Sequence, residues 1–278
     1  MVLVRRWDTG VELLRLPLDS LAGAALAHEV LPYADLRAAN LERADLRGAD
    51  LCLSDLRGAS LAEAALIGAD ITLANVAGAT FRKASLGDAR LQAVNLDVRG
   101  RAGTDFSGAD LTRVTLRNSN LSGATFTDAI LRRTDFTRCD LRGADFTGAD
   151  LTDANLSFAN LEGARLSYAM LAGAMLAGAN LEGATLARAD LSLASLNGAS
   201  LAGADFADSL WSKTALSRCT GFHRARGLAT VRFVDDSSAD VRTLREGIHD
   251  LPDDLLAHLG LLPAEVEALR RTAPPAGA

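Results

Sequence analysis

The sequence has few of the residues that cross-link small folds or bind metal ions. Only three cysteines occur in 278 residues, Cys52, Cys139 and Cys219, and no two of them stand at CxxC spacing. A disulfide scaffold or a zinc site is therefore not expected, and a reducing cytoplasm is the expected location. The four histidines are scattered, and none pairs with a cysteine or a second histidine at the spacing of metal ligands, so we expect no bound metal.

Other absences exclude further classes of protein. Aromatic residues make up 5% of the chain, so the bulk of the core must come from aliphatic side chains. No apolar run reaches the ~18 residues of a membrane helix, and the N-terminal segment lacks the unbroken apolar stretch of a signal peptide. The net charge is −6, without the basic excess that nucleic-acid or membrane-surface binding requires. We therefore expect neither kind of binding.

Catalytic and nucleotide-binding signatures are missing as well. The sequence contains no GxSxG, SxxK, GxxxxGK[ST] or GxGxxG motif. Its many Asp residues recur at the outward place of a repeat, where a solvated wall whose carboxylates bind turn amides explains them better than acid–base pairs do. Cys139 takes an inward place and should be inert. We expect no enzymatic activity and no cofactor.

What the sequence does contain is a repeat of five residues. From Leu21 to Leu216 every fifth residue is large and apolar: 30 of these 40 positions are Leu, six are Phe, and only Arg101 is charged. The residue two places before the next centre is Ala at 28 of 39 positions, and Gly fills the place two after the centre 16 times.

A period of five matches neither a helix nor a simple strand. A small and a large residue two apart point to one face of a short extended segment, and Gly suits the corner that follows. The repeat therefore predicts a chain wound into a prism in which Leu stacks on Leu.

The unit A(D/N)LXX, as in ADLRG, ANLER and ANLEG, resembles the pentapeptide-repeat family. The resemblance covers about residues 21–220. It implies an all-β solenoid, a right-handed quadrilateral β-helix with four units per turn and therefore about ten coils.

One segment, residues 96–106, breaks the repeat. Arg99 and Arg101 would fall in the Ala and Leu columns, where two buried guanidinium groups would cost several kcal/mol each. Skipping one unit brings Phe81 beneath Phe106, Phe126 and Phe146. We therefore predict an extruded loop near 97–103 with Arg99 and Arg101 exposed, either as a neutral insertion or as a contact site.

The ends of a solenoid need caps, because they leave backbone groups unpaired. Residues 1–20 read as a β-hairpin cap around a turn at 8–10. Residues 221–278 read as a strand at 228–234, then helices within 241–271 that should lie against the last turns, and a frayed tail from 273.

The outward positions of the upper half carry an apolar set. It comprises Phe158, Tyr168, Met170, Met175, Leu193 and Leu210, and Tyr33, Leu53 and Leu73 stack on one edge lower down. Clusters of exposed apolar groups usually mark a contact. Three occupants remain open: the C-terminal helices folding back, a homodimer seam, or a foreign protein.

Two functions remain open for such a rod. The family resemblance implies that it shields or inhibits DNA gyrase or another type II topoisomerase by DNA mimicry, which confers drug resistance. The alternative is a generic interaction scaffold or binding module of a bacterial signalling or resistance assembly. A central belt from Arg99 to Arg142, with eight Arg against five Asp, interrupts the acidic surface that mimicry needs.

Overall fold

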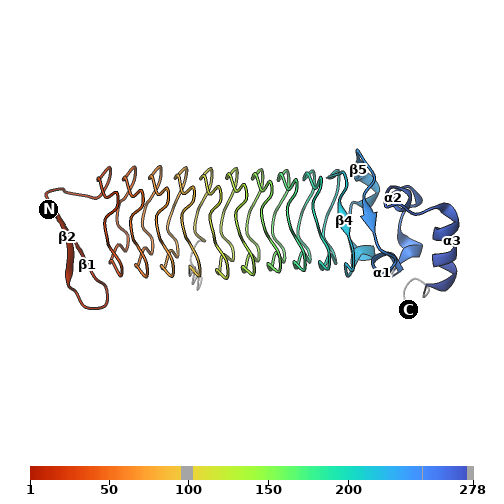
Figure 1. The fold of residues 1–278 in the computed structure, drawn as a ribbon, viewed down its shortest axis with the longest axis horizontal. Coiled ribbons are helices and arrows are strands. Elements are labelled where there is room, and N and C mark those ends of the chain that lie inside the picture. Colours follow the sequence, from red (N-terminus) through yellow and green to blue (C-terminus); the bar gives the residue numbers. More distant parts are fainter. Residues whose placement is uncertain (95–102, 246, 274–278) are drawn as a thin grey trace.

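The chain forms a long rod with a hairpin at one end and short helices at the other (Figure 1). The structure is a computed structural model, which describes residues 1–94, 103–245 and 247–273. The hairpin consists of β1 (Val2–Arg5) and β2 (Glu12–Leu16), which pair antiparallel. It is attached to the rod by the bridge between Arg6 and Ala34 and by the Trp7 Nε1–H, which donates to the Leu53 carbonyl at 2.8 Å.

The rod is a solenoid whose coils contain 20 residues each. Parallel bridges join residues 20 apart, such as Ala25 to Asp45 and Asp45 to Ala65, and a coil such as residues 41–60 contributes four of them. Four five-residue units therefore complete one turn, and each unit contributes a single ladder residue instead of a long strand.

Each unit ends in a tight turn that makes the corner. In the first, the Ala24 N–H donates to the Leu21 carbonyl at 3.1 Å, and Gly23 between them has a φ of +66°. A positive φ at the third residue is the mark of a type II turn, for which Gly is the least strained residue. Non-glycine residues such as Leu193 (φ +61°) also adopt this conformation at corners.

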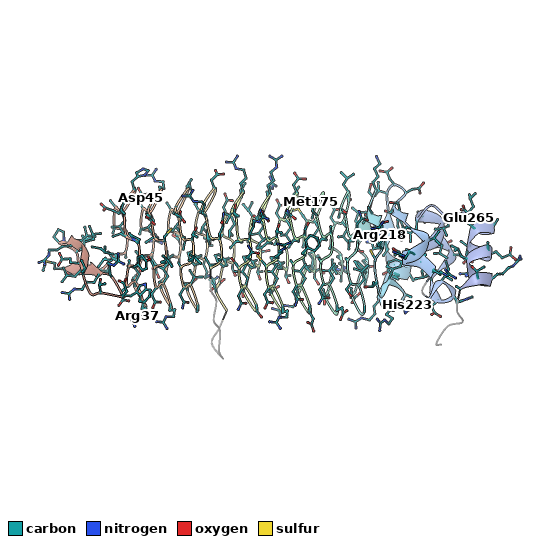
Figure 2. All side chains as sticks on the ribbon, turned by 60° about the horizontal axis from the view of Figure 1, so that its bottom comes forward. Arg37, Asp45, Met175, Arg218, His223 and Glu265 are labelled. Carbon is teal, nitrogen blue, oxygen red and sulfur yellow. The ribbon has the colours of Figure 1, made fainter. Side chains whose placement is uncertain are left out.

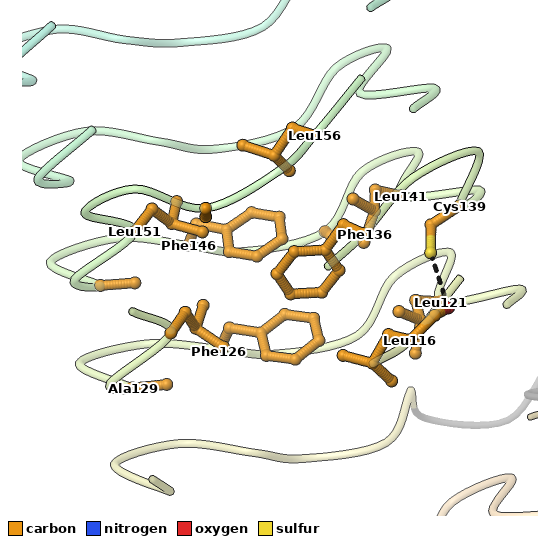
Figure 3. Close-up of a cluster of buried hydrophobic side chains, with 14 of the residues drawn as sticks. Leu116, Leu121, Phe126, Ala129, Phe136, Cys139, Leu141, Phe146, Leu151 and Leu156 are labelled. Carbon is orange, nitrogen blue, oxygen red and sulfur yellow. Dashed lines mark hydrogen bonds between the residues drawn. The ribbon is translucent and has the colours of Figure 1, made fainter. Parts of the chain in front are cut away.

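The core is the column of large residues predicted from the sequence. The described Leu and Phe side chains of that column are at most 5% exposed. The rings of Phe126 and Phe146 stack at 4.8 Å between centroids, and Phe136 meets Phe146 edge-on at 5.8 Å (Figure 3).

Polar side chains in the column of small residues donate hydrogen bonds to backbone carbonyls of the preceding coil. Ser54, Thr134 and Cys139 donate to the carbonyls of Leu31, Leu111 and Leu116 respectively (Figure 3 shows the last). These buried hydroxyl and thiol groups each have a partner, so the column accepts them without an unpaired donor.

The register changes in the middle of the rod. Asp70 bridges Arg90, which is 20 residues further along the chain, whereas Thr80 bridges Asp105, which is 25 residues further. Phe81 accordingly stacks on Phe106 at 4.9 Å. The five extra residues fall within the segment that contains Arg99 and Arg101. Both arginines lie outside the described residues, so the loop and their exposure stay predictions.

The solenoid continues past the repeats through two short ladders. β5 (Arg232–Phe233) pairs parallel with β3 (Leu210–Trp211), and β6 (Ser238–Ala239) pairs with β4 (Ala215–Leu216). The predicted strand at 228–234 is therefore wrong over its first half. Gly227, with a φ of +72°, instead begins a 3-10 turn, η2 (Leu228–Thr230), which buries Leu228. Another 3-10 turn, η1 (Phe222–Arg224), precedes it.

Short helices close the C-terminal end (Figure 1). They are α1 (Val241–Arg245), the 3-10 turn η3 (Ile248–Asp250), α2 (Asp253–His258) and α3 (Pro263–Thr272). These helices occupy the predicted range 241–271 to within one residue, but they are short, and Gly247, at a φ of +69°, begins η3 soon after α1 ends. Leu244, Ile248 and Leu256 are buried, and none of the helices in the described residues is long and apolar enough to cross a membrane.

Candidate protein-interaction surface

The outward side chains of the rod form columns that the bridges define. One column, which we call the Met170 face, is joined rung by rung through residues 25, 45, 65, 85, 110, 130, 150, 170, 190 and 210. The next column around the rod, the Met175 face, runs through residues 30, 50, 70, 90, 115, 135, 155, 175, 195 and 215. Both faces reach solvent, and Figure 2 labels Asp45 on the first and Met175 on the second.

The corner residues form columns too, because the N–H of each donates to the coil above. The Leu193 edge separates the two faces and contains residues 28, 48, 68, 88, 113, 133, 153, 173, 193 and 213. The Tyr168 edge, on the other side of the Met170 face, contains residues 23, 43, 63, 83, 108, 128, 148, 168, 188 and 208.

Five of the six predicted contact residues form one apolar band across these two faces. Phe158 is 61% exposed, Tyr168 56%, Met170 44%, Met175 45% and Leu193 62%. The stretch from Leu166 to Asn180, which contributes three of them, has no charged residue. The centre of the band is therefore uncharged, and Phe158 and Leu193 extend it into the coils below and above, which carry charges.

Contacts within the chain hold the two rings of the band. The Phe158 ring lies over Gly178, so a Cβ at Gly178 would lie 2.7 Å from the ring. The Tyr168 hydroxyl accepts a 2.8 Å hydrogen bond from Arg188 Nη1, and this guanidinium lies 5.5 Å from the ring centroid. The rings are thus positioned while most of their surface stays in solvent.

The sixth predicted residue, Leu210, is only partly exposed because its strand pairs with β5. The C-terminal helices do not cover the band: they close the end of the rod, and the band residues are exposed. That alternative for the occupant is therefore wrong. Sequence reasoning missed Ile130, which is 41% exposed and lies two rungs below Met170 on the same face. The 20-residue register would have found it.

A second, smaller apolar site lies on the edge that also carries Phe158. Tyr33, Leu53 and Leu73 stack there as predicted, and the Trp7 ring packs against Tyr33 with 6.2 Å between centroids. A shallow hollow of about 310 Å³ lies between Trp7, Leu53 and Leu73. The hairpin thus covers part of this column, and Leu73 stays 52% exposed.

Arginines neutralise many of the outward carboxylates. In the D-L-R units, Arg37, Arg47, Arg57 and Arg142 each fork onto the Asp two residues before, with contacts of 2.5–2.9 Å. The hydrogen bond from Arg47 lowers the pKa of Asp45 to about 2. Between coils, Arg165 binds Asp145 at 2.6 Å, and Arg132 pairs with the buried Asp150. The acidic wall is therefore a mosaic of ion pairs.

The carboxylates also brace the turns, as expected from the sequence. Asp50 Oδ1 accepts the Cys52 N–H at 3.0 Å, and Asp70 does the same for Thr72. Each such bond satisfies a corner amide with the side chain two residues before it. These groups are structural, and among the described residues no cluster of three or more His, Cys, Asp or Glu could hold a metal ion.

The thiols are held in unreactive states. Burial raises the pKa of Cys139 to about 12 and that of Cys219 to about 11. Burial, with hydrogen bonds to Asp70 and Asp50, raises the pKa of Cys52 to about 12. A thiolate nucleophile needs a lowered pKa, so the arrangement around these three groups disfavours thiolate chemistry.

These features define a class of protein: a solenoid of five-residue units that presents side chains on a rigid wall. The sequence profile described as "Pentapeptide repeats" matches residues 20–58, 34–72, 59–97, 129–167 and 174–210, and a second profile of that description matches 102–145. The chain therefore belongs to the pentapeptide-repeat family, as the sequence predicted.

Solved structures of the same family are similar to this chain. HetL from the cyanobacterium Nostoc sp. strain PCC 7120, involved in heterocyst differentiation regulation, is 28% identical over 80% of this chain and 92% of its own, with a TM-score of 0.41. The plasmid-mediated fluoroquinolone resistance protein QnrB1 is 21% identical over 70% and 91%, with a TM-score of 0.36. A pentapeptide repeat protein from the Arabidopsis thaliana thylakoid lumen is 40% identical over 38% and 66%, with a TM-score of 0.22. Comparison with curated protein sequences gave no match.

Proposed function

We propose that this protein is a non-enzymatic binding module that holds another protein against the apolar band of its solenoid wall. The observation that carries the proposal is the band itself: five large side chains, each 44–62% exposed, three of which lie in a stretch of fifteen residues without a charge. Monomeric proteins rarely leave such a contiguous patch in water without a use for it. The proposal takes the coil to be right-handed with about ten turns, as the family resemblance implies.

The chemistry of the band favours a protein over other ligands. Methionine and aromatic side chains are enriched in the cores of protein interfaces, and charged residues are depleted there. Met175 adapts its shape to a partner, while Phe158 is held over Gly178 and loses little freedom on binding. The ion pairs above and below the band make a polar rim.

A capture experiment with matched variants tests this proposal. The full chain is immobilised beside a Phe158→Gly/Met175→Asp double variant and a Thr185→Asp control on another face, and proteins retained from extract of the producing cells are quantified. We expect a partner that wild type and control retain and that the double variant loses at least tenfold. A set of retained proteins that is identical for all three chains would reject the band as the binding site.

A second, more specific candidate is a type II topoisomerase, shielded or inhibited through DNA mimicry in drug resistance. The straight rod and the net charge of −6 favour it (Figure 1). The Arg–Asp forks at residues 35–57 and 140–142 weigh against it, since mimicry requires a continuous negative face. For this reason the geometry supports the general binding module better.

An enzyme assay separates the two candidates. Gyrase supercoiling is measured with and without a fluoroquinolone at micromolar concentrations of this protein. Inhibition, or rescue from the drug, supports the topoisomerase candidate. Unchanged activity in both arms rejects that partner and leaves the general binding function to the capture experiment.

A further inference from the structure

We propose that the Met170 face binds the same face of a second copy of this chain, so that two rods lie side by side and parallel. The inference deepens the proposed function, and rests on it in one respect: it assigns half of the apolar band to self-association. Phe158 and Met175, on the neighbouring edge and face, stay available for a foreign partner.

The argument begins with the geometry of such a pair. A twofold axis parallel to the rods brings each residue of the Met170 face opposite itself. It brings the Tyr168 edge of one copy opposite the Leu193 edge of the other at the same height, because residues five apart lie on one coil. Each row of the interface thus joins a residue of the first edge to the residue five places later in the second copy.

Row by row, these two edges are complementary in charge. Lys83 meets Asp88, Asp128 meets Arg133, and Asp208 meets Lys213, and all six side chains are exposed. In the described edge rows from Arg43 to Lys213, no two like charges meet. On the axis itself Asp45, Asp110, Asp150 and Asp190 each meet their own copy, and of these Asp45 and Asp150 carry an arginine partner within the chain.

The two edges also differ in side-chain size. Where one edge carries a large side chain, the other carries glycine in most of the remaining rows. These rows join Arg43 to Gly48, Glu63 to Gly68, Gly108 to Arg113, Gly148 to Asp153, and Tyr168 to Gly173. Among these five glycines Gly68 is open to a partner's larger group, whereas the side chains of His28, Lys83, Asp128 and Asp153 lie over the other four.

Two other arrangements oppose like charges along the edges. On the Met175 face the flanking corners of one coil would oppose Arg133 to Arg138 and Lys213 to Arg218. An antiparallel pair of Met170 faces centred on Met170 would oppose Asp128 to Asp208. Like charges in direct opposition suppress a pairing, so the edge rows favour the parallel arrangement of the Met170 face over these two.

The centre of the Met170 face supplies apolar contacts. Ile130, Met170 and Leu210 occupy alternate rungs of its upper half. The carboxylates between them are engaged within the chain: Asp150 is 6% exposed and pairs with Arg132, and Asp190 Oδ1 accepts the Ser192 N–H at 2.9 Å. Nine rows at ~4.8 Å extend ~43 Å, and a strip of that length reaches the ~800 Å² a side of a standard interface at a width of ~20 Å.

Reversing the charges of Asp208 and Lys213, which meet in one row, tests the proposal. Sedimentation equilibrium is measured for wild type, Asp208→Lys, Lys213→Asp and the double exchange, with Met175→Lys as a control on the neighbouring face. We expect a wild-type dimer at micromolar concentration, at least tenfold weaker dimerisation in each single variant, and recovery in the double exchange. The Met175→Lys control should dimerise like wild type.

Cross-linking tests the parallel orientation separately. Met170→Cys and Ser85→Cys, made one at a time, should each form an intermolecular disulfide on mild oxidation, because a parallel twofold brings both positions opposite themselves. An antiparallel pair can bring only one of them to the axis.

A wild-type monomer at 100 µM, single variants that dimerise normally, or cross-linking of only one cysteine variant would overturn the proposal. Self-association and the binding of a foreign partner are tested independently. Loss of the dimer leaves the capture of a partner through Phe158 and Met175 to be judged by its own variants.

Discussion

Two leucines that lie two residues apart provide the sharpest test of the solenoid. Leu191 is fully buried in the central column, whereas Leu193 stands at a corner and is 62% exposed. Both belong to one coil and have the same side chain, so truncation of each to alanine removes the same atoms from two different environments. The fold alone decides how the effects differ.

The expected magnitudes differ several-fold. Leu191→Ala removes a side chain with no exposed surface and leaves a cavity between stacked rungs, which costs about 3–5 kcal/mol of unfolding free energy. Full burial of a leucine side chain contributes about 1.5–3 kcal/mol, and little more than a third of Leu193 is covered, so Leu193→Ala should cost at most about 1 kcal/mol.

Urea unfolding followed by circular dichroism gives the overall change. Hydrogen exchange of the peptide around residues 185–200 gives the local change, because a solenoid can open near the altered coil before the rest. We expect fast exchange of the Leu191 and Ala194 amides in Leu191→Ala only. Equal destabilisation by the two variants would refute the assignment of the column as core and the corner as wall.

Three further predictions concern the end, the thiols and the corners. Burial raises the pKa of Asp240, but hydrogen bonds from the Thr243 hydroxyl and nearby amides outweigh it and lower the value to about 2. Asp240→Asn should therefore lose about 2 kcal/mol at pH 7, and wild type should lose that advantage as the pH falls from about 4 to 2 in thermal unfolding scans; a flat pH profile contradicts the assignment. Cys139 should react with a thiol reagent at pH 8 only after unfolding, since burial raises its pKa to about 12, and rapid labelling of the native chain would show otherwise. Gly183→Ala should cost about 0.5–1 kcal/mol, because the strain of about 1–2 kcal/mol at its φ of +64° is partly offset by the lower entropy of the unfolded chain. Gly178→Ala should in addition displace the Phe158 ring and weaken partner capture; equal binding by both variants would exclude that role for the ring.

The interior of the rod could be predicted almost completely from the sequence. A period of five with Leu and Ala two apart leaves the chain one way to bury both, and residues such as Leu166 and Ala164 are buried as that pattern requires. The number of sides did not follow from the period. It entered through the family resemblance, because a turn after every fifth residue is compatible with more than one polygon.

The C-terminal end was predictable only in outline. The apolar run at 228–234 indicated a strand, but its first residues form the 3-10 turn after Gly227, and pairing with Leu210–Trp211 is limited to Arg232–Phe233. The position of the helices depends on long-range contacts such as the stacking of His258 on Phe233 at 4.4 Å. No local pattern encodes such a contact.

The corners indicate where this wall is adapted for binding. A corner residue has a positive φ, which strains any L-residue by about 1–2 kcal/mol, so glycine is the least strained choice. One edge of the rod makes that choice almost throughout, at residues 58, 78, 123, 143, 163, 183 and 203. The opposite edge instead holds Asp88, Arg133, Asp153 and Leu193 in the left-handed conformation. Side chains kept there at the expense of stability need another reason to be present. Contact with a partner is the reason that we propose, because the Tyr168 edge, the Leu193 edge and the edge of Phe158 all hold such side chains and border the Met170 and Met175 faces.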